Sequence, residues 1–135
     1  MRQDLDAQLC KDFPLLYADR HANMQVTAMC WGFPGDGWEP LIREASRQLE
    51  ALISLQLHPE NYKAAQVKEK FATLCFYMTD TTPEMDEVIR KAVAKSAVTC
   101  EECSAPGKQR GRGWIYTACD DHTEAADKYK GKQSK

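Results

Sequence analysis

The chain has 135 residues, of which 43% are hydrophobic and 28% are charged, and its formal net charge is −2. This length suits one domain with its own core, or a small core domain joined to a further module. The near-neutral charge excludes a strongly basic protein that is drawn onto nucleic acid as a whole, and no apolar run reaches the length needed to span a bilayer.

The first third of the chain predicts little regular structure. No apolar segment follows residues 1–6, so we expect no signal peptide. Apolar residues at helical spacing then indicate a short helix that ends near Lys11 or Asp12, ahead of Pro14. Residues 24–31 are rich in β-branched and large side chains, which favours a short strand.

An aromatic and glycine-rich loop covers residues 30–38. It places Trp31, Phe33 and Trp38 among three glycines. One interpretation is a binding surface, because tryptophan and other aromatic anchors dominate protein interfaces. The other is a turn, permitted by its glycines, that folds the two tryptophans into the core.

The clearest helical pattern follows this loop. Asp36 is the expected N-cap, and Glu39 three residues later completes a capping-box-like pair. Apolar residues over 38–53 then form one buried face. We expect the helix to end near His58, because Pro59 disfavours helical geometry in the residue before it.

A hairpin and a further helix come next. The alternation of apolar residues over 65–79 indicates β structure, and its parity changes at 71–72, which favours a tight turn over a bulge. Thr82 is the predicted N-cap of this further helix, and Pro83 takes its first helical position. We expect this helix to run to about Ala97.

Two pairs of soft metal ligands follow. Cys100 and Cys103 form the first pair, Cys119 and His122 form the second, and fifteen residues separate them. Each pair can chelate through a tight turn while the spacer folds as a hairpin, which is typical of a tetrahedral zinc site. Three thiolates and one imidazole fill all four positions, so the pattern predicts a structural Zn²⁺ ion.

The predicted module around this site completes an α+β fold. Residues 108–112 and 113–118 can pair as short strands, and 119–129 is helix-compatible, which together favours a treble-clef-like arrangement. A zinc ribbon is the alternative, in which the second ligand pair lies in a β-knuckle. We therefore expect an α+β body over 1–98 and a zinc-binding module over 99–135 that packs on it.

The other cysteines, Cys10, Cys30 and Cys75, lie in apolar surroundings and are odd in number. Reduced, buried thiols of a cytoplasmic protein are the better interpretation.

The spacer between the ligand pairs carries Lys108, Arg110, Arg112 and Trp114. One interpretation is a hairpin laid against a phosphate backbone, with the tryptophan stacking on a base. The other is a solvated hairpin whose cations balance the thiolates while Trp114 covers the metal.

These motifs together resemble a group of small, mostly uncharacterised proteins encoded by tailed bacteriophages and prophages. The similar blocks are PLLYADR at 14–20, MCWGFPGDGW at 29–38, QVKEKF at 66–71 and the Cys/His block at 100–122. Ala72 and Cys75 stand where this group leads us to expect a glycine and an arginine. The resemblance implies phage origin and action in the bacterial cytoplasm, and it implies no established activity.

Three functions follow as hypotheses. The first is non-enzymatic binding of a host or phage protein through loop 30–38 and the finger, the predicted zinc-binding module at 99–135. Small phage proteins of this kind often act on host proteins, so inhibition of an antiviral defence complex is one form of this hypothesis. The second is nucleic-acid binding through the finger. The third is a metal-dependent nuclease or hydrolase, which needs an open ligand position and Asp120 or Asp121 as general base. We expect no membrane partner and no small-molecule substrate.

Overall fold

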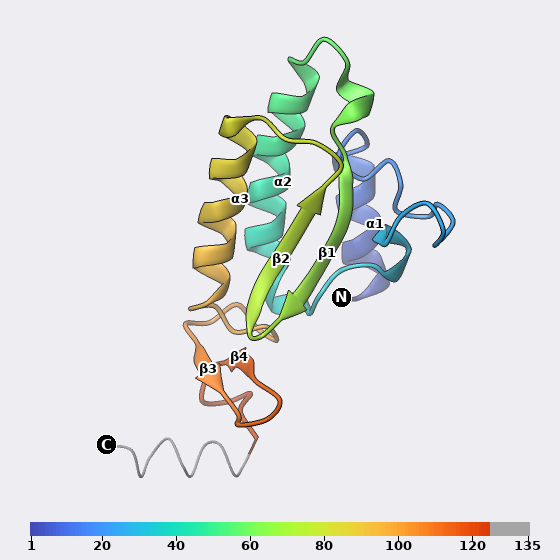
Figure 1. The fold of residues 1–135 in the computed structure, drawn as a ribbon. Coiled ribbons are helices and arrows are strands. Elements are labelled where there is room, and N and C mark those ends of the chain that lie inside the picture. The colour runs from blue at the N-terminus through green and yellow to red at the C-terminus, as the bar shows by residue number, and fades with distance from the viewer. Residues whose placement is uncertain (125–135) are drawn as a thin grey trace.

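The computed structural model describes residues 1–124 and has an α+β architecture. Three short 3₁₀ turns and two antiparallel two-stranded sheets accompany three α-helices in the described part of the chain (Figure 1). The α-helices are α1 (Gln3–Asp12), α2 (Glu39–Ser54) and α3 (Pro83–Ser96). The strands are β1 (Ala64–Lys70), β2 (Thr73–Met78), β3 (Lys108–Arg110) and β4 (Tyr116–Ala118), and the 3₁₀ turns are Met29–Trp31, Asp36–Trp38 and Pro59–Asn61. The α+β prediction is confirmed.

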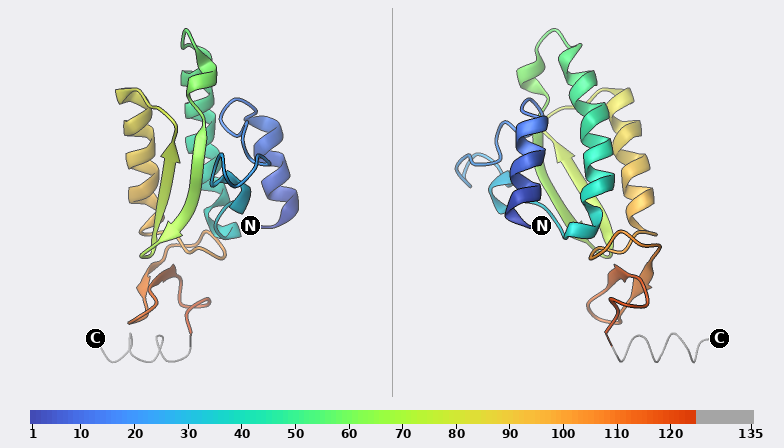
Figure 2. Two further views of the ribbon diagram at one scale, coloured as in Figure 1. Left: turned by 45° about the vertical axis from the view of Figure 1, so that its right-hand side comes forward. Right: turned by 180° about the vertical axis from the view of Figure 1, so that it is seen from behind.

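The helices lie on one face of the β1–β2 hairpin, and the core fills the space between these two layers (Figure 2). Its largest fully buried side chains include Leu9, Trp38, Ile42, Ile53, Leu74 and Met85. Burying each such side chain stabilises the fold by about 1.5–3 kcal/mol. The hairpin turn, the start of α2 and the end of α3 all lie at the end of the body that faces β3 and β4 (Figure 1).

The predicted hairpin is confirmed, with a two-residue turn at Phe71 and Ala72. Both residues have positive φ, 52° and 67°, as a type I′ turn requires. The Glu69 carboxylate accepts a hydrogen bond from the Ala72 amide, and the Ala72 carbonyl accepts one from the Thr117 hydroxyl. These contacts offset the strain of two non-glycine residues in the left-handed region.

Helix α3 agrees with the prediction, because the Thr82 side chain accepts from the Met85 amide and Pro83 starts the helix. Two expectations for α2 are wrong. The Asp36 carboxylate accepts from the Arg2 amide and does not cap the helix, which instead continues from a 3₁₀ turn. The helix also ends at Ser54, because Gln56 turns its side-chain amide back to the carbonyl of Leu52.

The strand expected over 24–31 is wrong. The Asn23 carbonyl accepts from the amides of Val26 and Thr27, and the Asn23 side chain accepts from the Gln25 amide. These local hydrogen bonds form turns, and a 3₁₀ turn at Met29–Trp31 follows. Turn formation by Asn23 therefore outweighs the β-propensity of the residues after it. Across residues 1–124, every helix falls short of the length and apolarity that crossing a membrane requires.

Candidate metal centre

All four predicted metal ligands converge beside strand β4. One ligand atom from each of Cys100, Cys103, Cys119 and His122 lies within 4.8 Å of the other three. The Cys103 and Cys119 sulfurs are 3.6 Å apart, and His122 Nδ1 is 3.2 Å from the Cys119 sulfur and 3.8 Å from the Cys100 sulfur. A tetrahedral ion with bonds of about 2.3 Å to sulfur and about 2.0 Å to nitrogen requires ligand–ligand distances of about 3.5–3.8 Å. The cluster can therefore hold a metal ion.

The first ligand pair lies on a tight knuckle. The Cys100 amide donates to the Ala105 carbonyl, and the Ser104 amide donates to the Cys100 carbonyl. Ser104 takes a positive φ of 71°, which turns the chain sharply after Cys103. The Glu102 amide also points at the Cys100 sulfur at 3.4 Å, a contact that stabilises a thiolate.

The second pair lies on a turn that follows β4. Residues 119–124 form turns and bends, with the His122 amide donating to the Cys119 carbonyl. The helix expected from Cys119 is therefore wrong over 119–124, because this local turn brings His122 back to the cysteine. The rest of the expected helix, 125–129, lies outside the described residues. In a zinc ribbon, the second ligand pair lies on a turn that follows a strand, as Cys119 and His122 do here after β4.

Thiol acidity distinguishes Cys119 in the cluster from Cys10 in the helical body. The hydrogen bond from His122 lowers the pKa of the Cys119 thiol to about 7, although burial opposes this shift. Burial and the neighbouring Asp6 carboxylate instead raise the pKa of Cys10 to about 11. Metal ions bind the thiolate form, so Cys119 is prepared to bind a metal at neutral pH and Cys10 is not.

Loop 30–38 forms the joint between the body and the metal centre. The Gly37 amide donates to the Glu101 carbonyl at 2.7 Å, and the Ser104 hydroxyl donates to the Gly37 carbonyl at 2.6 Å. A Cβ atom at Gly37 would overlap the Cys100 carbonyl oxygen, far inside van der Waals contact. Only glycine permits this approach of the two backbones.

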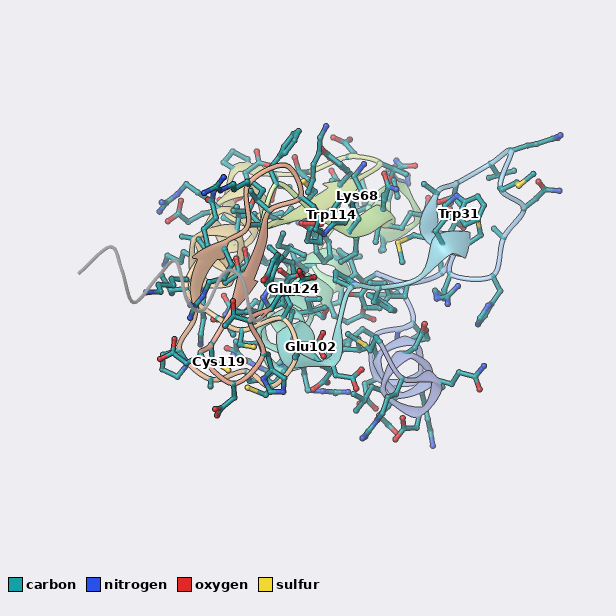
Figure 3. The ribbon with its side chains drawn as sticks, turned by 90° about the horizontal axis from the view of Figure 1, so that it is seen from below. Trp31, Lys68, Glu102, Trp114, Cys119 and Glu124 are labelled. Atoms are coloured by element: carbon teal, nitrogen blue, oxygen red, sulfur yellow. The ribbon has the colours of Figure 1, made fainter. Side chains whose placement is uncertain are left out.

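The aromatic residues of this loop take three different positions. Trp38 is fully buried and donates through its indole N–H to the Thr99 carbonyl at 2.8 Å. Phe33 is half-buried against the ring of Tyr17. Trp31 is 73% exposed and points away from the metal centre (Figure 3). Trp38 is therefore unavailable to a partner, and the alternative that folds both tryptophans into the core is wrong for Trp31.

We expect Trp38→Phe to lower the free energy of unfolding by about 1–3 kcal/mol, because the Thr99 carbonyl loses its buried donor. Urea unfolding followed by circular dichroism measures this change. Trp31→Phe is the control, since an exposed ring with no such hydrogen bond predicts a change within about 0.5 kcal/mol. Equal losses in both variants would contradict the role given to the Trp38 indole.

The predicted cationic hairpin is only partly exposed. Arg110 is 7% exposed, and its guanidinium donates to the Ala118 carbonyl and to the Asp120 carboxylate. Lys108 and Arg112 remain exposed. The ion pair between Arg110 and Asp120 could not be predicted from the sequence, because it depends on the turn after β4.

Trp114 is 80% exposed and lies apart from Cys119 when the molecule is viewed from below, so it does not cover the ligand cluster (Figure 3). It lines a surface hollow of about 350 Å³ that also contains Glu101, Glu102 and Glu124. Burial raises the pKa of Glu101; the amide of Thr117, which donates to it, opposes the shift, and the charges of Glu69 and Glu102 add to it. Sequence reasoning missed this acidic surface, because its members are far apart in the chain.

Comparisons of the chain with protein-family models, with curated proteins and with solved structures gave no match.

Proposed function

We propose that the protein is a non-enzymatic, zinc-stabilised binding protein whose partner is another protein. The observation that carries this proposal is the convergence of three cysteine sulfurs and one histidine nitrogen within 4.8 Å of one another. Soft sulfur ligands with one imidazole favour Zn²⁺, and four protein ligands leave no position for a reactive water.

A structural role for the ion fits the small size of the surrounding elements. Strands β3 and β4 contain three residues each, and their buried cluster consists of Cys100, Ala118 and Cys119. Such a segment buries too little apolar surface to fold alone, so metal binding would supply its folding free energy.

A protein partner fits the exposed aromatic residues better than nucleic acid or a hydrolytic reaction does. Trp31 and Trp114 offer large apolar anchors to a partner surface. The nucleic-acid alternative retains only Lys108 and Arg112 as exposed cations of the finger hairpin, which is little positive charge for phosphate binding. The hydrolase alternative needs a fourth position open for water, and His122 is placed to fill it.

The biological setting of the proposal comes from the resemblance to small phage proteins. In this setting the protein acts in the bacterial cytoplasm on a host protein, and inhibition of an antiviral defence complex is its most specific form.

The test is capture of a partner from nuclease-treated bacterial lysate on the immobilised, zinc-loaded full chain. We expect one host protein at near-stoichiometric yield, lost with Cys119→Ser and retained with Cys75→Ser, whose thiol lies outside the metal cluster. Capture of nucleic acid in untreated lysate, or equal recovery with both variants, would contradict the proposal.

A further inference from the structure

An apolar hollow of about 190 Å³ lies between the β1–β2 turn and the loop that leads into β4. Its apolar walls are Phe71, Trp114 and Ile115. Phe71 is 69% exposed, although a type I′ turn favours small residues such as asparagine and glycine. The ammonium of Lys70 lies over the Phe71 ring at 5.5 Å and borders this hollow.

The apolar hollow adjoins the acidic hollow beside the metal centre, and Trp114 lines both. Glu101, Glu102 and Glu124 contribute three carboxylates to the acidic hollow. Viewed from below, Trp114, Glu124 and Glu102 follow one another across the same side of the molecule (Figure 3). Among residues 1–124, no ion pair joins any of these three carboxylates to a cation.

We propose that these two hollows form one docking surface, the Trp114 surface, for a basic segment of a protein partner that carries an apolar side chain beside lysine or arginine. The apolar side chain enters the hollow between Phe71 and Trp114, and the cation lies over the acidic hollow. This inference rests on the proposed function and specifies the chemistry of its partner.

Charge and anchor geometry both favour this occupant. A cation near Trp114 gains attraction from the aromatic face as well as from the carboxylates of Glu102 and Glu124. A phosphate backbone would instead be repelled by these carboxylates, none of which is neutralised by an ion pair within residues 1–124. Trp114 stands where the two hollows meet, and a central aromatic residue with surrounding polar groups is the common arrangement of an interface hot spot.

The test measures binding of a fluorescein-labelled peptide of alternating lysine and leucine to the zinc-loaded full chain by fluorescence anisotropy. We expect Trp114→Ala to weaken binding about tenfold or more. Glu102→Gln should weaken it about two- to fivefold. Affinity should also fall as salt rises from about 50 to about 300 mM.

Two matched variants test whether the peptide binds non-specifically to exposed apolar or acidic side chains. Leu57→Ala removes an apolar side chain that is 88% exposed in the segment between α2 and the 3₁₀ turn at Pro59–Asn61, and Glu60→Gln removes an exposed carboxylate far from the hollows; both should leave binding unchanged. Peptides of lysine with serine, or of glutamate with leucine, should bind much more weakly. Zinc content and circular dichroism confirm that each variant is folded.

Five outcomes would overturn the inference. Four of them are equal loss of peptide binding with Leu57→Ala, equal binding of the lysine–serine peptide, binding of single-stranded DNA that Trp114→Ala abolishes, and self-association that depends on Trp114. A captured host protein retained by Trp114→Ala would also overturn it while leaving the proposed function in place. Failure to capture any host protein would instead count against the proposed function, which the peptide measurement does not test.

Discussion

Cys119→Ser should reduce bound zinc from about one ion per chain to about a tenth or less, because a serine hydroxyl does not ionise to replace the thiolate. Structural zinc contributes about 10–16 kcal/mol of apparent binding free energy in small zinc modules. Its loss should therefore unfold residues 99–124 and leave the helical body folded. Metal analysis by mass spectrometry and two-dimensional amide NMR measure both effects.

The chain offers a matched control for this experiment. Cys75→Ser changes a half-buried thiol on β2 that lies outside the ligand cluster, so zinc content should stay unchanged. Zinc chelation of the unaltered chain should reproduce the Cys119→Ser spectrum. A chelated chain whose amide signals for 99–124 keep their dispersion would contradict a structural role for the ion.

Gly37→Ala should destabilise the protein by about 1–3 kcal/mol and weaken zinc binding together, because the added methyl group would overlap the Cys100 carbonyl. The two backbones must then separate, which lengthens the hydrogen bond from the Gly37 amide to Glu101 and displaces Cys100. Urea unfolding with and without chelator, and zinc competition with a fluorescent chelator, measure the two losses.

Gly113→Ala is the matched control for this second prediction. No atom lies within 4 Å of the position a Cβ would take at Gly113, so the same chemical change should have little effect. Comparable destabilisation by both substitutions would contradict the prediction, because it would show that the loss at Gly37 does not come from its close contact with the Cys100 carbonyl.

The features that could be predicted from the sequence are those set by residues close to one another in the chain. The capping signal at Thr82, the parity change at 71–72 and the two ligand pairs each occupy a few adjacent residues, and each prediction agrees with the structure. Features set by contacts across long stretches of chain were not predictable. Asp36 carries a cap-like sequence but binds the Arg2 amide, 34 residues away.

The same limit applies to the surface. Trp31, Trp38 and Trp114 look alike in the sequence, yet one is buried and two are exposed on different parts of the molecule. Only tertiary contacts decide among these positions. The acidic hollow is formed by Glu101 and Glu102 on one segment and Glu124 on another, which the ligand cluster brings together. No local sequence pattern therefore predicts it.

The contact between Gly37 and the Cys100 knuckle couples metal binding to the folding of the helical body. Since the Cys100 knuckle is held by hydrogen bonds from the helical body, body folding and metal affinity are thermodynamically linked, and each must strengthen the other by the same factor. A substitution deep in the helical core should therefore release zinc at lower chelator concentrations. Metal retention would then report the integrity of a core that contributes no ligand to the ion.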